Sequence, residues 1–296
     1  MGVWGSLREF LKEYFWLRVL IGVSLVILTL MVWHWKRRKD RLAYLREQWR
    51  LAGQNVVVLH QFPRARFCPN PSPFSIKLET FLRMTGIKYV NDFEEYLSHK
   101  QKCPWITVNG KDVADSQLAI LHLNDILDRS PSKGFSGRDQ GAGNAFRIML
   151  EDHFYWGFVL DRWIYQRGYH AVDNFEPLPL PVNVTRLMFR WAGRRLLGQA
   201  EAHGMGRHTQ DEVERLCLGD LKAISEYLGD KPFLLGDTPT EVDCTLFGFM
   251  VMIFHCSQDD LVYRTETKDK WNNLFLHMER MKEKYWPDWD EVQNKK

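Results

Sequence analysis

The residues best placed to do chemistry form the stretch Ser72-Pro73-Phe74-Ser75, which lies between an apolar run and a helical pattern. The run, residues 56–62, is short and β-branched, which predicts a strand buried on both faces. A connector with three prolines, residues 63–71, leads to Ser72 as N-cap and Pro73 as first helical residue. Because a helix N-terminus offers free N–H groups and a favourable dipole to an anion, this turn can hold a thiolate.

The side chains of this turn argue against dithiol chemistry. Thioredoxin-like proteins keep a reactive Cys-x-x-Cys pair at such a strand–loop–helix turn, but Ser72 and Ser75 occupy both positions here. A hydroxyl of high pKa does not replace a thiolate. We interpret Cys68, in the proline-rich connector, as an incidental thiol and not a nucleophile.

Three later stretches carry a more specific resemblance, which covers about residues 56–290. Residues 103–110, Cys-Pro-Trp-Ile-Thr-Val-Asn-Gly, resemble the cis-proline segment of the glutathione transferase N-terminal domain. Residues 115–123, beginning Asp-Ser-Gln, resemble the acidic–Ser pair and helix that hold the γ-glutamyl end of glutathione in that family. Residues 232–243 resemble the capping box of its second domain, in which Asp243 reaches back to the N–H of Thr240.

Within that superfamily the chain resembles the failed axon connections proteins, which are relatives of metaxin. The stretches that carry this resemblance are residues 61–64 with 69–74, residues 151–156 (Glu-Asp-His-Phe-Tyr-Trp) and residues 203–208 (His-Gly-Met-Gly-Arg-His). Cadmium-responsive transferase-like proteins are near cousins of the group. The resemblance implies a glutathione-transferase-like protein with a role in axon development and no well-defined reaction.

The resemblance also implies the residues of a site. Ser72 would be catalytic, stabilising the thiolate of glutathione, and Cys103, Pro104, Asp115 and Ser116 would bind glutathione as a ligand or co-substrate. No cofactor is required. Structural roles explain the same residues, because Ser72 and Ser116 can each act as a helix cap and Cys103 can simply be packed.

Several other functions find no support in the sequence. There is no Cys-x-x-Cys or His-Glu-x-x-His metal motif, and no Gly-x-Ser-x-Gly hydrolase motif. The formal net charge is +3, which does not indicate nucleic-acid binding. The five cysteines are odd in number and unclustered, which argues against a disulfide framework.

The order of the predicted elements gives the fold class. The elements βαβ and then ββα predict an α/β thioredoxin-like domain, followed by an all-α domain, as in glutathione S-transferases. Strands are expected at 87–90, 105–108 and 111–114, and helices at 116–127, 144–167, 182–203, 209–228, 243–255 and 268–285. The predicted organisation is an anchor (1–36), a basic stalk (37–54), the thioredoxin-like domain (55–129), a linker (130–143), the helical domain (144–288) and a polar tail (289–296).

The amino terminus predicts one transmembrane helix. Residues 14–35 form a largely apolar segment of 22 residues, which as a helix spans about 33 Å, close to the hydrocarbon thickness of a bilayer. Aromatic residues lie at both ends, as in interfacial belts. A cleaved signal peptide is the alternative, but Lys36-Arg37-Arg38-Lys39 stands where a small-residue cleavage site is expected.

The basic residues predict the orientation of this anchor. Three precede the apolar core and seven follow it, which places the folded domain in the cytosol and the N-terminus on the lumenal or external side. The sequence leaves open whether the membrane is the mitochondrial outer membrane or one of the secretory pathway. The protein partner and any homo-oligomer are also left open.

Two functions of different class remain. One is a transferase fold reused as a binding or scaffold module, with its cleft lost or filled, and we favour this interpretation. The other is a glutathione-dependent transferase in detoxification or stress response. An open cleft beside Ser72, Cys103 and Ser116 would favour the enzyme, and a cleft plugged by Arg66 or Phe67 would favour the scaffold. Arg186, Arg190 and Arg194 form a basic stripe, either a solvated helix face or a contact with anionic lipid.

Overall fold

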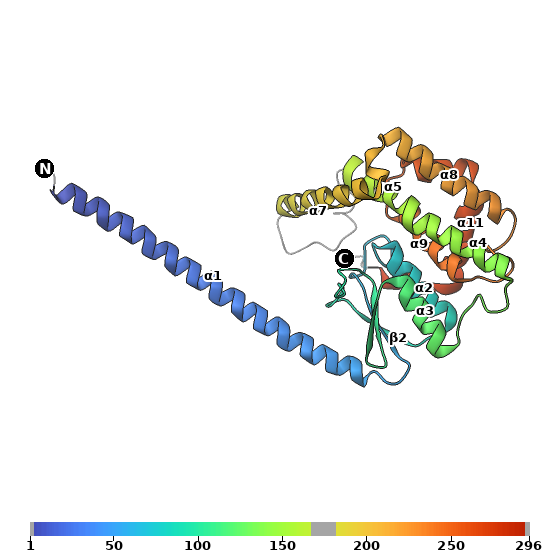
Figure 1. Ribbon diagram of the computed structural model, residues 1–296, viewed down its shortest axis with the longest axis horizontal. Helices are drawn as coiled ribbons and strands as arrows, with labels where there is room; N and C mark the ends of the chain where they lie inside the picture. Colours follow the sequence, from blue (N-terminus) through green and yellow to red (C-terminus); the bar gives the residue numbers. More distant parts are fainter. Residues whose placement is uncertain (1–2, 167–181, 294–296) are drawn as a thin grey trace. The chain divides into compact units, whose positions relative to one another are not determined.

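The computed structural model describes residues 3–166 and 182–293. The chain divides into two units, Met1–Gly53 and Gln54–Lys296 (Figure 1). Every residue of the hydrophobic core lies between Val57 and Val292. The second unit therefore has a complete core of its own, and we expect it to fold without the first.

The first unit is one continuous helix, α1 (Val3–Leu51), so the expected anchor and the expected stalk are parts of a single element. By length and composition the segment Val19–Leu51 can cross a membrane, and its most apolar window is not buried against other parts of the protein. Two cation–π contacts lie at the end of the apolar stretch, from Arg37 to Trp33 and from Lys39 to Trp35. Such pairs of aromatic and basic side chains are typical of a membrane interface.

The second unit begins with a four-stranded sheet in the order β2-β1-β3-β4. Strand β1 (Val57–His60) pairs in parallel with β2 (Tyr89–Asp92) and antiparallel with β3 (Trp105–Val108), which pairs with β4 (Lys111–Ala114). Helices α2 (Pro73–Thr85) and α3 (Ser116–Leu127) lie between this sheet and the helical domain (Figure 1). This arrangement is the predicted thioredoxin-like domain.

Strand β2 begins two residues later than predicted. Gly86 ends α2 in the left-handed conformation, with φ +67°, and the N–H of Ile87 then donates to the carbonyl of Leu82. Ile87 therefore still belongs to the helix cap, which is the usual role of a glycine after a helix. Residues 93–102 contain no helix, and Asn109 and Gly110 form the predicted hairpin turn with φ of 51° and 77°.

The predicted linker is shorter than expected. Ser136 caps helix α4 (Gly137–Ile148), so residues 137–143, which include three glycines, are helical. The chain continues through a π-helical segment (Met149–Phe154), α5 (Tyr155–Leu160) and a second π-helical segment (Asp161–Tyr165). Gly143 lies against Leu235 and Val242, where a side chain would meet neighbours at 3.3 Å, and this packing explains a glycine inside the helix.

The rest of the helical domain follows the prediction with two differences. The remaining helices are α7 (Val182–His203), α8 (Gln210–Leu228), α9 (Glu241–His255), α10 (Val262–Lys270), α11 (Asn272–Tyr285) and α12 (Trp289–Val292), with a 3-10 turn at Met205–Arg207. The expected last helix is two helices, which meet at Trp271. The expected polar tail carries Trp289, which is 5% exposed and belongs to the core. The loop predicted at 173–181 lies outside the described residues.

Helices α2 and α9 form the main contact between the two domains (Figure 1). They approach most closely at Gly248, where an added Cβ would lie 2.4 Å from the carbonyl oxygen of Pro73. Lys77 lies on the same side of α2 and is 1% exposed. Its Nζ donates to Oε1 of Glu151 at 2.5 Å and to Oε1 of Gln117 at 2.6 Å, so this buried charge is paired, as burial requires.

Candidate functional site

The loop that presents Ser72 is held by Asn70. The Asn70 side chain accepts a hydrogen bond from the backbone N–H of Ser72 at 3.0 Å and donates to the carbonyl of Phe62 at 2.8 Å. Ser72 caps α2 as predicted, because its Oγ accepts from the N–H of Ser75 at 3.4 Å. Among the described residues nothing accepts the hydroxyl proton of Ser72, so this proton can be donated to a ligand in the cleft.

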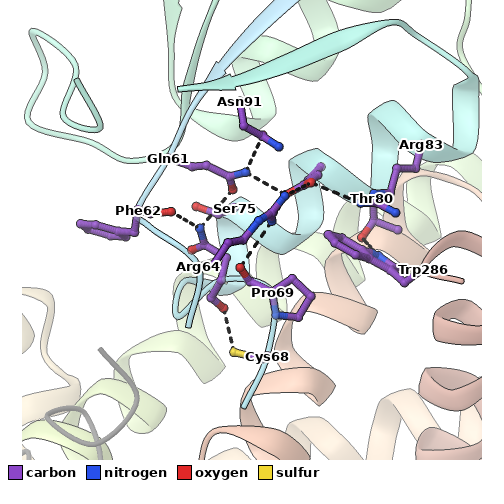
Figure 2. Close-up of polar contacts among 12 residues, drawn as sticks. Gln61, Phe62, Arg64, Cys68, Pro69, Ser75, Thr80, Arg83, Asn91 and Trp286 are labelled. Atoms are coloured by element: carbon purple, nitrogen blue, oxygen red, sulfur yellow. Dashed lines mark hydrogen bonds and ion pairs between the residues drawn. The ribbon is translucent and has the colours of Figure 1, made fainter. Parts of the chain in front are cut away.

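A buried carboxylate fixes the other end of this loop (Figure 2). Glu79 is fully buried on α2, and both its oxygens accept from the guanidinium of Arg64, at 2.7 and 2.8 Å. It also accepts from Nε2 of Gln61 and from the hydroxyl of Tyr89. Burial raises the pKa of Glu79, but Arg64, Gln61 and Arg83 more than offset this effect, so its pKa lies below the ordinary value. Glu79 is therefore a charged anchor for the loop.

Cys103 and Pro104 lie on the opposite side of the turn, and the bond between them is cis as predicted. The Sγ of Cys103 lies 3.8 Å from Oγ of Ser75. Burial raises the pKa of the Cys103 thiol to about 12, so it is protonated at neutral pH and is a poor nucleophile. Ser72, Ser75 and Cys103 are thus brought together, without a reactive thiol among them.

Asp115, and not Ser116, caps helix α3. Its Oδ1 accepts from the N–H groups of Gln117 and Leu118, at 2.9 and 3.4 Å, and its Oδ2 accepts from Lys102 at 2.8 Å. Burial raises the pKa of Asp115, but Lys102 and the helix N–H groups more than offset this, so the pKa is lowered. Asp115 adopts φ +94°, a conformation rare outside glycine and one that is often found at functional sites.

Ser116 is therefore released from the capping role that the sequence left open. Its side chain is buried, and it lines the cleft described below. No hydrogen-bond partner is present for its hydroxyl among the described residues. Ser116 and Ser72 thus each present a hydroxyl proton that can be donated to a ligand, from the N-termini of α3 and α2, while the Ser72 oxygen also caps α2.

These groups open onto a cleft of about 790 Å³ between the two domains. The polar part of its lining contains four of the five predicted site residues, Ser72, Cys103, Asp115 and Ser116, with Lys102, Glu151 and Asp152, whereas Pro104 is not among the lining residues. The rest of the lining is largely apolar and comes mainly from the helical domain, chiefly Tyr155, Trp156, Phe158, Trp163, Met188, Phe189 and Trp191, with Phe74 of α2 beside them. Neither Arg66 nor Phe67 is among the described residues that line the cleft, so the plug that would favour a filled, scaffold-type cleft is absent there, and the open cleft favours a ligand-binding or enzymatic role.

Arg162 is a cleft residue that the sequence analysis missed. It is 7% exposed and donates to the carbonyls of Pro71 and Cys256, at 3.2 and 3.3 Å, while its guanidinium lies 4.4 Å from the ring centre of Phe158. It therefore ties the helical domain to the residue before Ser72. Arg162 and Pro71 are 91 residues apart, so the sequence around either residue does not indicate their contact. The one sequence feature that could have drawn attention to Arg162 is its charge within the aromatic stretch 154–165.

Comparisons with known proteins agree with this geometry. The family model of the glutathione S-transferase N-terminal domain matches residues 73–168, and that of the C-terminal domain matches residues 217–281. A crystal structure of a glutathione S-transferase of Ceriporiopsis subvermispora in complex with glutathione has the same fold. The TM-score is 0.55 at 16% identity, over 78% of this chain and 98% of that one. The fold and the site define a glutathione S-transferase-like protein.

Sequence comparison shows which glutathione S-transferase-like proteins the chain resembles. The chain is 33% identical to Failed axon connections of Drosophila melanogaster over 81% of its own length and 60% of that protein. It is 23% identical to metaxin-2 of Mus musculus, over 80% of this chain and 90% of the relative. The chain belongs to the metaxin-related, glutathione S-transferase-like family that includes Failed axon connections, as its sequence indicates.

An enzyme is also among the relatives. Isoprene-epoxide–glutathione S-transferase of Rhodococcus is 27% identical, over 78% of this chain and 99% of the enzyme. This relationship is compatible with either a binding or a catalytic role for the cleft.

Proposed function

We propose that the chain is a membrane-anchored binding module whose cleft takes glutathione. The observation that carries this proposal is that Ser72 and Ser116, at the N-termini of two helices, line one open cleft, and that each has a hydroxyl proton with no acceptor among the described residues. The thiol would lie beside Ser72, at the positive N-terminus of α2, and the γ-glutamyl carboxylate beside Ser116. The aromatic half of the cleft would remain free for a second, apolar ligand. No cofactor is needed for binding.

Replacement of Ser116 by alanine is expected to weaken glutathione binding by about ten- to a hundredfold. A hydrogen bond to a charged group contributes roughly 1.5–3 kcal/mol, and the carboxylate would lose one. Because Asp115 provides the cap, Ser116→Ala should leave the stability of α3 nearly unchanged. Calorimetric titration of residues 54–296 with glutathione measures the affinity, and thermal melting checks the fold.

Ser136→Ala is the matched control for this variant. Ser136 caps α4, outside the cleft lining, so its loss costs about 1 kcal/mol of stability but should not change the affinity. Equal affinity of wild type and a folded Ser116→Ala variant would refute the site, and no binding by the folded wild type would refute the proposal.

The second candidate is a glutathione transferase that joins the thiol to an apolar electrophile. The aromatic half of the cleft and the relationship to an epoxide-conjugating enzyme favour it. In that reaction the thiol proton leaves to solvent, and the thiolate sulfur forms a bond to the electrophilic carbon. The bond from that carbon to its leaving group breaks: an epoxide oxygen stays on the product and takes a proton from solvent, and an aryl halide releases halide. Ser72 would donate its hydroxyl proton to the thiolate, lowering the thiol pKa together with the dipole of α2.

Ser72→Ala is expected to lower turnover of an epoxide or an aryl halide about 10²- to 10³-fold, as the loss of one donor to a developing anion does. The thiolate absorbance of bound glutathione should fall with it, while glutathione affinity changes little. Ser75→Ala, which removes a buried hydroxyl outside the cleft lining, is the control. Full activity in Ser72→Ala would show that Ser72 does not stabilise the thiolate. A wild-type protein without transferase activity would contradict the transferase proposal and leave the binding module as the proposed function.

The proposal also includes the location of the protein in the cell and its biological role. Residues 14–35 would span the bilayer, with the second unit in the cytosol, in a mitochondrial outer or secretory-pathway membrane. The module would act through a protein partner or a second copy of itself. The name of the Drosophila relative supports a role in axon development.

A further inference from the structure

Helix α7 carries an apolar stripe that is not used by the core. Val184, Leu187, Met188 and Trp191 are 43%, 68%, 49% and 66% exposed. Their spacing of three, four and seven residues places them on one face of the helix. Exposed apolar side chains that gather in this way usually mark a contact surface.

The opposite side of the same helix accounts for its packing. Thr185 and Ala200 are buried, and Phe189 stacks on Trp163 with ring centres 5.4 Å apart. At 100° per residue these positions cluster about 150° from the exposed apolar stripe. The stripe therefore faces away from the protein core, and none of its four side chains belongs to that core.

A row of arginines lies next to the apolar stripe on the surface of α7. Arg186, Arg190 and Arg194 recur every four residues and are exposed, and Arg195 follows at the cleft mouth. Residues 182–200 contain four arginines and neither aspartate nor glutamate. A helix with an apolar face, an adjacent row of arginines and an exposed tryptophan has the pattern of helices that lie in a membrane interface.

We propose that α7 lies on the surface of an anionic bilayer, with its apolar stripe at the headgroup level and its arginines against lipid phosphates. The inference rests on the anchor proposed above, because the anchor holds the second unit at high effective concentration near a bilayer. The positive charge of α7 favours an anionic bilayer over a second copy of the chain as the surface that it contacts. A uniformly basic helix matches the negative cytoplasmic leaflet and would repel an identical helix of a second copy.

Docking of α7 also specifies the ligand class of the cleft. Met188, Trp191 and Arg195 belong both to the α7 surface and to the lining of the cleft. The cleft mouth would therefore open at the headgroup level, where apolar compounds dissolved in the bilayer are concentrated. The second ligand of the cleft is accordingly a lipophilic molecule taken from the membrane.

The test uses the full chain in nanodiscs, at one copy per disc, with an environment-sensitive fluorophore on Leu187→Cys. Its emission should rise and shift to the blue when phosphatidylserine is added to phosphatidylcholine, and high salt should reverse the change. Leu276→Cys, 49% exposed on α11, is the matched control and should not respond. The labelled wild-type chain corrects for native cysteines.

Replacing Arg186, Arg190 and Arg194 by glutamine should lower the ratio of docked to free α7 about fivefold per arginine. A chain that enters the discs but shows no response at Leu187→Cys, or the same response in neutral discs, would overturn the docking. A response that depends on two copies per disc would also overturn it and assign the stripe to self-association. A chain that fails to co-elute with the discs would instead overturn the anchor.

Discussion

Glu79→Gln is expected to lower the free energy of unfolding by about 3 to 5 kcal/mol, because it removes one partner of a buried ion pair. The change keeps the shape of the side chain but leaves Arg64, whose side chain is 16% exposed, without its carboxylate. Arg64 lies on the loop before Ser72 (Figure 2), and it would lose both of its hydrogen bonds to the carboxylate, so we expect glutathione affinity to fall as well. Urea unfolding of residues 54–296 measures the loss of stability.

Glu226→Gln is the control for the loss of a negative charge. Glu226 pairs with Lys222 at 3.7 Å on the surface of α8, with both side chains more than half exposed, so the change should cost less than about 1 kcal/mol. Equal effects of the two substitutions would show that the Glu79 network does not stabilise the fold.

The pH dependence of the Glu79 effect has a definite sign. The folded-state pKa of Glu79 lies below its ordinary value, so the carboxylate stabilises the fold above the unfolded-state pKa of about 4.3. This contribution is lost as the pH falls through the folded-state pKa. The difference between wild type and Glu79→Gln should therefore be constant above about pH 5 and shrink under acid conditions.

Trp286→Ala should cost about 3 to 5 kcal/mol, the usual range for removing a large buried aromatic side chain. Trp286 is 1% exposed, and its Nε1 donates to Oγ1 of Thr80 at 3.0 Å, across 206 residues. The guanidinium of Arg83 lies 3.9 Å from the centre of its ring. The side chain therefore joins the end of the helical domain to α2.

Trp286→Phe separates packing from hydrogen bonding. Phenylalanine keeps a ring beneath Arg83 but cannot donate to Thr80, so the expected loss is about 1–3 kcal/mol. Denaturant unfolding of both variants gives the comparison. A loss in Trp286→Ala no larger than that in Trp286→Phe would contradict the assigned packing role.

The parts of the fold that follow from local chemistry could be predicted from the sequence. Residues 105–108 and 111–114 form strands as expected, because Asn109-Gly110 adopts the two positive φ angles that a tight hairpin needs. Helices α3 and α7 also have their predicted bounds, since a cap or a proline precedes each of them.

The parts that depend on distant contacts could not be predicted. Trp289 stands among charged residues, and its packing against distant aromatic side chains, Phe247 and His255 among them, makes it part of the core. At the site, sequence could name Asp115 and Ser116 but could not say which of them caps α3. The burial of Lys77 could have been suspected from the sequence, because a lysine between Phe74 and Leu78 interrupts the apolar face of α2.

The contact between Gly248 and Pro73 has a consequence for how ligands reach the cleft. The backbone of α9 lies directly against the first residue of α2, with no layer of side chains between them at this point, so we expect the two domains not to close on a ligand by a hinge motion. We therefore expect the polar part of the cleft to have the same shape with and without a ligand. Binding would then not carry the entropic cost of ordering its side chains and loops. Adaptation to ligands of different size must come from the wall that α7 contributes.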